Sequence, residues 1–414
     1  MLRPKAVLRS GARLSDHLAI AHLARYSPLY RVRELLSELG LQSKRKRGLP
    51  AEVAFFYVLS LCLYRNLSQE EVLRIVVEGL RSVYGDEVED IVPTKAAISR
   101  ARTRLGPLPL EMMYSESIRP VGNEARSGLT YAGLRVMVID ESTLDIADEK
   151  INARYFGYPS VNRGSSACPQ LRFVVLTECA THVMTGAKMG PCKVSGQVLA
   201  KEVLKRADSS MLVLPGRGLS GYPVWLAAGE QGCKRLFQDW SNQVFPVIRE
   251  LDDGSFISGL YSDQRRRKRA SKSQILEEVE RVRVIEFELL MDDGEVKSCR
   301  LITDLLDEFK FPAHDLAHLY HRRWRVELAL DELKVHLNEN MSLRSKRPDL
   351  VRQEFYAMLF VHGIIRKLML QAADMTAHTA EELSFAGAPW IARRRLPGLV
   401  VFPRRNVSPG IKAF

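Results

Sequence analysis

The sequence predicts a mixed α/β protein in which a helical N-terminal part precedes a sheet of interleaved strands and helices. Three observations predict it. Up to about residue 125, apolar residues recur at helical spacing between capping signals. From about residue 126, short apolar runs of strand length alternate with helical segments, which is typical of a mixed sheet. Residues 245–302 carry strand patterns, interrupted by a basic loop, and indicate a β-rich insertion.

The N-terminal helices are bounded by residues that favour helix ends. Ser68, followed three residues later by Glu71, reads as a capping box, and Thr94 reads as another N-cap. Pro50 suits the first turn of a helix, and Gly106 suits a helix end. The predicted helices cover 32–39, 53–64, 72–81 and 95–105.

The helix predicted at 95–105 is rich in cations. Its basic residues are Lys95, Arg100, Arg102 and Arg104. They would suit the second helix of a helix-turn-helix, which lies in the major groove of DNA. An exposed basic helix that packs through Ile98, Ala101 and Leu105 is the equally weighted alternative.

The predicted sheet begins with an apolar run at 135–139 that ends at Asp140, as expected of a buried strand. Further strands are predicted at 171–178, 182–188, 210–214 and 235–237, and helices at 195–206, at 222–231 and from Ala313 onward.

Composition narrows the class of protein. Lys and Arg number 61 against 49 Asp and Glu, a formal charge of +12 that favours a polyanionic partner such as nucleic acid. The six cysteines form no Cys-x2-Cys pair, so a zinc ribbon is not expected. We expect instead that they are reduced thiols of a cytoplasmic protein. Apolar runs of membrane length are absent from the sequence, so no membrane partner is expected.

The most informative stretch reads Tyr-x2-Arg-x3-Glu-x6-Lys and comprises Tyr320, Arg323, Glu327 and Lys334. On one continuous helix these four side chains would share a face. One carboxylate would then lie among two cations and a phenol, as a metal-binding acid beside a phosphate backbone requires. By charge alone, a solvated helix with i,i+4 pairs is the simpler interpretation.

With this full spacing, the chain resembles the insertion-sequence-four family of DDE transposases over nearly its whole length. The resemblance implies a ribonuclease-H-like catalytic domain, cut-and-paste DNA transposition, and Mg²⁺ or Mn²⁺ held by three acids. It also implies double-stranded DNA as partner and a homodimer when DNA is bound. The expected domains are a DNA-binding domain at 1–125, the first catalytic part at 126–240, the insertion at 241–305, and the helical remainder with a basic tail at 306–414.

The resemblance assigns two of the three acids. Asp140 matches the first position and Glu327 the third, so both are expected as catalytic metal ligands. The second position, where the family carries an aspartate before Arg-Gly, is Gly216 here. Asp239 is a weakly supported substitute, and Glu141 is expected to point away from Asp140. Strand cleavage is therefore expected to be impaired.

The cations keep the family pattern. By resemblance, Tyr320, Arg323 and Lys334 contact phosphates of the transposon end. Arg265, Arg266 and Arg267, in the basic loop of the insertion, are expected to follow the DNA backbone, or else to form a solvated loop. The alternative function is a domesticated transposase fold that serves as a DNA-binding regulator or performs different chemistry on another substrate.

Overall fold

The computed structural model describes residues 14–43, 48–89, 91, 94–121, 129–159, 167–239, 245–261, 278–290, 296–323, 325–374 and 385. The basic runs at 44–47 and 265–269 lie outside the described residues. The chain divides into two compact units. One combines Met1–Ile118 with Glu332–Phe414, and the other is Arg119–Asp331. The four predicted domains follow a different division and remain a prediction.

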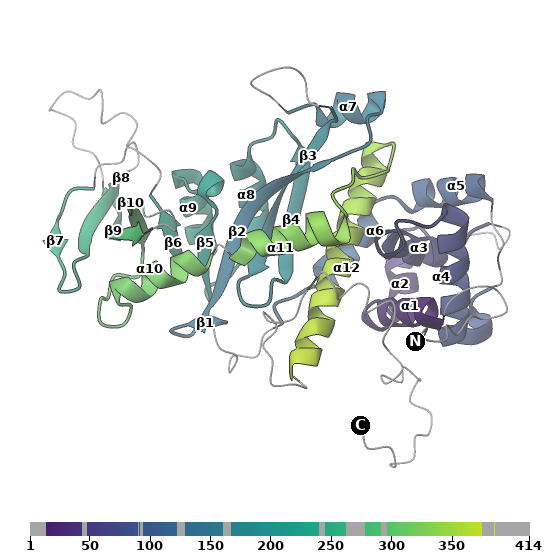
Figure 1. Cartoon of the computed structure of the whole chain (residues 1–414), viewed down its shortest axis with the longest axis horizontal. Helices are drawn as coiled ribbons and strands as arrows, with labels where there is room; N and C mark the ends of the chain where they lie inside the picture. Colours follow the sequence, from purple (N-terminus) through teal and green to yellow (C-terminus); the bar gives the residue numbers. More distant parts are fainter. Residues whose placement is uncertain are drawn as a thin grey trace, which may run out of the picture. The chain divides into compact units, whose positions relative to one another are not determined.

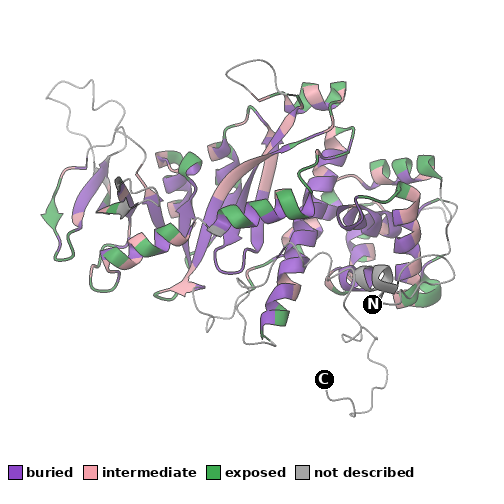
Figure 2. Ribbon diagram, in the orientation of Figure 1, coloured by how far each residue is buried: buried purple, intermediate pink, exposed green. Residues whose placement is uncertain are grey.

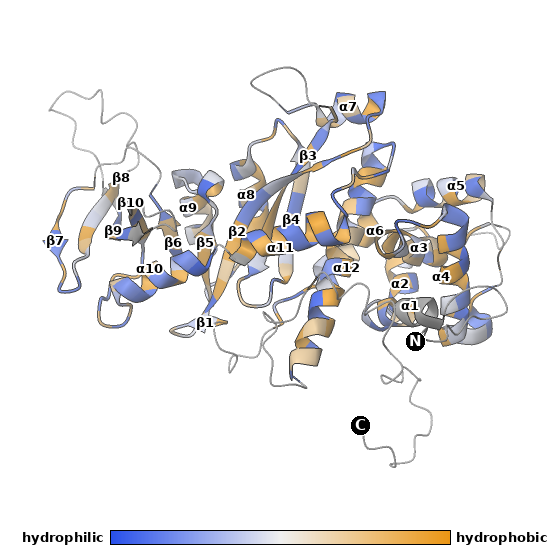
Figure 3. Ribbon diagram, viewed as in Figure 1, coloured by the Kyte–Doolittle hydropathy of each residue, from blue (hydrophilic) through white to orange (hydrophobic). Residues whose placement is uncertain are grey.

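The first unit is helical. Its elements are α1 (Leu14–Tyr26), α2 (Leu29–Glu38), α3 (Ala51–Leu63), α4 (Gln69–Tyr84), η1 (Gly85–Glu87), α5 (Lys95–Leu105), α6 (Leu108–Ser117), η4 (Glu332–Leu337) and α12 (Pro348–Asp374). Helix α3 is apolar along most of its length and is buried almost throughout (Figure 3). The predicted buried helix at 53–64 is thus confirmed.

The predicted N-caps at Ser68 and Thr94 are confirmed, whereas the Glu71 side chain of the predicted capping box pairs with Arg74. The side-chain oxygen of Ser68 accepts a hydrogen bond from the Glu71 amide at 3.2 Å, and that of Thr94 accepts one from the Ala97 amide at 3.3 Å. Gly106 follows α5 with a φ of 64°, a left-handed conformation that glycine adopts without strain.

Helix α12 belongs to this unit because buried polar side chains join it to α5. The Gln353 side chain donates to the carbonyl oxygens of Arg102 at 3.1 Å and Gly106 at 2.8 Å, and accepts from Nε of Arg102 at 3.0 Å. Arg102 also donates to Ser345 at 2.9 Å. The sequence grouped Arg102 with the cations expected to face a DNA groove. Its side chain instead bonds to Gln353 and Ser345, which lie far from it in sequence.

The second unit contains the sheet (Figure 1). Its first strands are β2 (Leu134–Asp145), β3 (Gln170–Glu178), β4 (Met184–Pro191), β5 (Met211–Pro215) and β6 (Lys234–Gln238), with the short β1 (Thr130–Tyr131) beside β2. The order is β4-β3-β2-β5-β6, in which β2, β3 and β4 are antiparallel and β5 and β6 run parallel to β2. This arrangement is ribonuclease-H-like, as expected.

The insertion extends the same sheet. Strand β10 (Val296–Thr303) pairs antiparallel with β6, and β9 (Glu278–Leu290), β8 (Phe256–Tyr261) and β7 (Arg249–Glu250) follow outward in that order. The strands predicted within 245–302 are therefore present, and they form one sheet with the strands before them.

Helices cover both faces of this sheet. On one face, α8 (Gly196–Leu204) and α9 (Tyr222–Glu230) pack their apolar side chains against Met137, Ile139 and Val213. On the other, α10 (Ala313–Arg322) and α11 (Arg325–Asp331) pack against Val136, Val138 and Leu214. Figure 2 shows α10 with one buried and one exposed side. The short helices α7 (Lys150–Phe156) and η2 (Arg217–Leu219) lie in connections. Across the described ranges, no helix is both long and apolar enough to span a membrane.

Candidate active site

Asp140 lies where two parallel strands separate. Strand β5 pairs with β2 as far as Ile139, opposite Pro215, whereas β3 pairs with β2 as far as Asp145. The expectation that the strand ends at Asp140 is therefore wrong, because the antiparallel partner carries β2 five residues further. Asp140 nevertheless stands at the carboxyl edge of β5, where α/β sheets commonly place their binding groups.

Gly216 is the first residue after β5 and the neighbour of Asp140. Its amide donates to the carbonyl oxygen of Ile139 at 2.8 Å. A β-carbon on Gly216 would lie 2.0 Å from Oδ1 of Asp140 and 2.7 Å from its Cγ. Oδ1 also accepts a hydrogen bond from the Glu141 amide at 2.8 Å, which holds the carboxylate there. Asp140 thus fills the space in which any side chain at position 216 would begin.

The charge of Asp140 is set by opposing influences. Burial raises its pKa, the hydrogen bond from the Glu141 amide and the charge of Arg323 lower it, and the charges of Glu327 and Glu141 raise it. The net shift is upward. Because the charge of Glu327 acts on the pKa of Asp140, the two predicted acids lie in the same region of the fold. Helix α11, which carries Glu327, packs against β2.

Two other acids near Asp140 in sequence or topology are already engaged. The Glu141 carboxylate pairs with Arg172 at 2.8 Å and lies against Gly196, where a β-carbon would come within 1.9 Å of it. Gly196 begins α8, on the opposite face of the sheet from Asp140, as strand alternation expects. Asp239, the weak substitute, follows β6 and pairs with Arg300 at 3.3 Å.

The Tyr-Arg-Glu-Lys motif does not lie on one continuous helix, so that expectation is wrong. Helix α10 ends at Arg322, and the Arg323 and Val326 amides bond to carbonyl oxygens only three residues earlier. A π-helix starts at Glu332. The three-residue turns at Arg323 and Val326 and the π-helix at Glu332 do not have 3.6 residues per turn. The four side chains therefore do not share one helix face. Tyr320 and Arg323 are buried and Glu327 is exposed, while Lys334 belongs to the helical unit.

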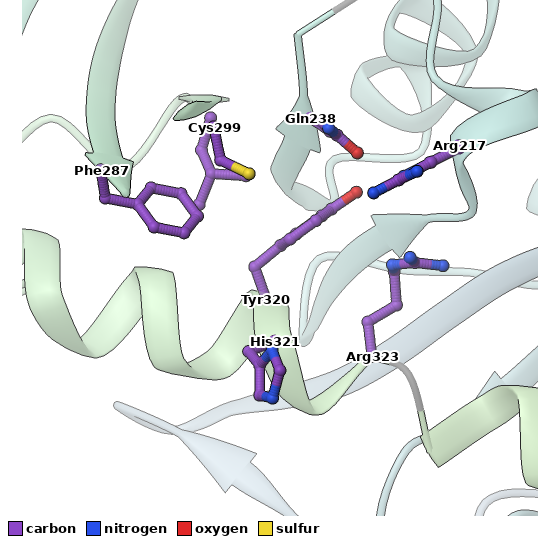
Figure 4. A pocket seen from close by; sticks show the side chains of 8 residues that line it. Arg217, Gln238, Phe287, Cys299, Tyr320, His321 and Arg323 are labelled. Carbon is purple, nitrogen blue, oxygen red and sulfur yellow. The ribbon is translucent and has the colours of Figure 1, made fainter. Parts of the chain in front are cut away.

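Tyr320 and Arg323 line a small pocket together with Arg217, the residue that follows Gly216 in sequence (Figure 4). The Tyr320 hydroxyl donates to the carbonyl oxygen of Pro215 at 3.4 Å and points toward Gln238 and Arg217. Burial raises the pKa of Tyr320, although the charges of Arg323 and Arg217 lower it. The full lining is Arg217, Gln238, Phe287, Cys299, Leu301, Tyr320, His321 and Arg323.

Sequence reasoning missed Arg217 and Gln238 as lining residues. Arg217 was recognisable, since it directly follows the position of the second acid. Gln238 carries no such local signal, because it reaches the pocket only through the parallel pairing of β6 with β5. The pocket gathers two guanidinium groups and a phenol around a cavity of about 20 Å³, so it concentrates positive charge at this edge of the sheet but has room for little more than a water molecule.

The acids in this region do not fit a centre built on three carboxylates. Among the described residues, no group of three or more His, Cys, Asp or Glu side chains is placed to hold a metal ion. Asp140 and Glu327 are only two acids, and the Asp140 carboxylate occupies the space beside Gly216, the second position. Mg²⁺ prefers several hard oxygen ligands in octahedral geometry, which two carboxylates supply poorly.

The remaining predicted DNA contacts lie elsewhere. Lys95 and Arg100 are exposed on α5, and Lys95 lies 3.3 Å from Glu70. Arg265, Arg266 and Arg267 lie outside the described residues. The roles of all these residues remain predictions.

Comparison with known proteins covers both parts of the chain. The family described as "Transposase DDE domain" matches residues 131–364, and the family described as "Insertion element 4 transposase N-terminal" matches residues 17–115. Transposase InsG for insertion sequence element IS4 of Escherichia coli K12 is 25% identical over 91% of this chain and 81% of its own length. Putative transposase InsZ of the same organism is 23% identical over 54% of this chain and 73% of its own length.

A solved structure is also similar. The piggyBac transposase, in a synaptic complex with hairpin DNA, aligns with 99% of this chain and 90% of its own at 11% identity. The TM-score is 0.44, a value too low to establish a shared fold.

Proposed function

Because this chain belongs to the transposase family defined by the DDE domain, we propose that it binds double-stranded DNA at the ends of a mobile element and is impaired in metal-dependent cleavage and strand transfer. The observation that carries the proposal is glycine at position 216, where the second acid is expected, with the Asp140 carboxylate turned into the space that a side chain there would use. On DNA we propose a homodimer, and we expect the protein in the cytoplasm.

Charge and geometry support the DNA-binding part. The chain carries a formal charge of +12, and Arg217 and Arg323 place two guanidinium groups at the same edge of the sheet. We assign DNA-backbone contacts also to Lys334, to Lys95 and Arg100 on α5, and to Arg265, Arg266 and Arg267. Contacts of this kind release counterions, so the affinity should fall steeply as salt rises.

The missing acid supports the impaired-cleavage part. Mg²⁺ or Mn²⁺ would have to be held by Asp140 and Glu327 alone, with binding correspondingly weak. A loss of roughly 3–4 kcal/mol of transition-state stabilisation lowers a rate by about a hundred- to a thousandfold. A domesticated fold that acts as a DNA-binding regulator, or that has acquired different chemistry, is the alternative.

The test uses labelled DNA that carries the sequences flanking the gene, with Mg²⁺ or Mn²⁺ present. The parent chain is expected to bind these ends with little or no nicking. Arg323→Ala should weaken binding by about tenfold or more, Arg323→Lys by less, and the neighbouring Arg322→Ala serves as a control for loss of one charge. A melting curve of each variant checks that it is folded.

Two results contradict the proposal. Efficient nicking by the parent that Asp140→Asn abolishes would mean that the site is complete and the impairment claim is wrong. Equal affinity for these ends and for unrelated DNA, with no loss in Arg323→Ala, would remove end binding and favour the alternative function.

A further inference from the structure

Helix α10 begins without a capping side chain of its own. Its N-cap residue is Pro312, which has no side-chain oxygen, although N-caps usually supply one to the first amides. The Ala313 amide instead donates to Oδ2 of Asp253 at 2.9 Å, from a residue sixty positions earlier. Asp253 lies in the turn between β7 and β8, so the insertion caps this helix.

Asp253 is held in place by its own turn. Its Oδ1 accepts from the Ser255 hydroxyl at 2.5 Å and from the Ser255 amide at 3.2 Å. Gly254 between them has a φ of 80°, the left-handed conformation that lets the turn close. Oδ2 therefore faces the start of α10 from a fixed position.

Arg283 ties this turn to the segment that leads into α10. It lies on β9, is fully buried, and forms an ion pair with Asp253. Its Nε donates to the Ser255 hydroxyl at 2.7 Å. Its Nη1 donates to the carbonyl oxygen of Phe311 at 2.6 Å and lies 3.4 Å from that of Leu305. One arginine thus bonds both to the Asp253 turn and to the segment that precedes α10.

The other end of α10 reaches the pocket that Arg217 also lines. Tyr320 lies in its last turn and Arg323 directly follows it. Asp253 and the pocket side chains therefore lie at opposite ends of one helix of 10 residues, about 15 Å long.

We propose that Asp253 is a positioning residue of the insertion: it caps α10 from a distance and, with Arg283, fixes where this helix presents Tyr320 and Arg323. Its effect on DNA rests on the proposed function of the pocket. A turn that merely stabilises the insertion would contribute to the free energy of unfolding but would have no specific effect on α10.

Amide hydrogen exchange in the free protein tests the cap. In Asp253→Ala the Ala313 amide should exchange about fivefold faster, the effect of losing a typical N-cap. The exposed Asp252→Ala, which removes the same charge from the same turn, should leave that amide unchanged. Adding Pro312→Ser to Asp253→Ala supplies a local cap and should restore protection. Unchanged exchange in Asp253→Ala, or no rescue by Pro312→Ser, overturns the capping role.

A double-mutant cycle on DNA affinity tests the positioning. Asp253→Ala should weaken binding by roughly three- to tenfold in the parent, and by much less in the Arg323→Ala background, because coupled residues are not additive. Equal losses in both backgrounds overturn positioning. If Arg323→Ala alone leaves affinity unchanged, the proposed function of the pocket fails and positioning fails with it, whereas the exchange measurement still decides the cap.

Discussion

The carboxylate of Asp140 occupies the place where a side chain on Gly216 would start, with only 2.0 Å between Oδ1 and an ideal β-carbon at that glycine. The two residues are neighbours on parallel strands, so an aspartate at 216 would stand beside Asp140 on the same face. The Asp140 carboxylate thus lies in the space beside the missing acid. Restoring aspartate at 216 therefore requires Asp140 to leave its hydrogen bond with the Glu141 amide.

Gly216→Ala is expected to lower the free energy of unfolding by about 1 kcal/mol, because the Asp140 carboxylate must turn aside and lose its hydrogen bond from the Glu141 amide. In an Asp140→Ala background the same substitution should cost much less, since the clashing carboxylate is gone. Urea unfolding of the four proteins measures the difference. Equal costs in both backgrounds would show that Asp140 does not fill this space.

The charge of Asp140 is expected to reduce stability at neutral pH. Its folded pKa is raised, first by burial, so the native state binds the proton more tightly than the unfolded chain does. Stability should therefore increase as pH falls from neutral through the folded pKa toward the unfolded value of about 4. Asp140→Asn should raise the melting temperature at pH 7 and remove that part of the pH dependence. A lower melting temperature in the variant at pH 7 would contradict this assignment.

The charge of Asp253, in contrast, should increase stability at neutral pH. Burial would raise its pKa, but hydrogen bonds from Ser255 and Ala313 and the charge of Arg283 outweigh burial, and the net shift is downward. Its stabilising contribution is then fully present above the unfolded pKa of about 4 and is lost as pH falls through the folded pKa. The stability difference between the parent and Asp253→Asn, measured by urea unfolding, should shrink below pH 4. A difference that is constant down to pH 2 would rule out this linkage.

Gln353→Ala should lower the free energy of unfolding of the helical unit by about 2–3 kcal/mol, because two carbonyl oxygens at the end of α5 lose a buried donor. Gln371→Ala is the control: this glutamine is exposed on the same helix, and its side chain bonds with Tyr26 rather than with α5. Thermal unfolding compares them. Equal small losses would mean that α12 does not hold α5 through this side chain.

Local signals were sufficient for most of the secondary structure. Ser68 and Thr94 begin helices because their side chains satisfy nearby amides, and this depends only on residues three positions away. The apolar run before Asp140 was recognisable as a buried strand for a similarly local reason. The end of that strand was not recognisable from the sequence. It depends on its partner strands: β3 continues to pair with β2 up to Asp145, whereas β5 stops pairing at Ile139.

The break in the Tyr-Arg-Glu-Lys motif had the same origin. Its spacing fits one face of an ideal helix, but the tight turns at Arg323 and the π-helix at Glu332 are not visible in that spacing. In the folded chain Glu332 is buried with Arg366 and His362 from α12. Contacts of this range are absent from any window of sequence.

The sequence by itself determined the family and most of the order of helices and strands. It also predicted Asp140 and Glu327 as acids of the site and placed Gly216 where the family carries its second acid. These follow from residue identity and short spacing. Only the tertiary structure decided that Asp140 fills the space above Gly216, that Glu141 faces α8, and that Asp253 caps α10. Each of these joins residues from separate elements, and their meeting is set by strand pairing and packing rather than by local preference.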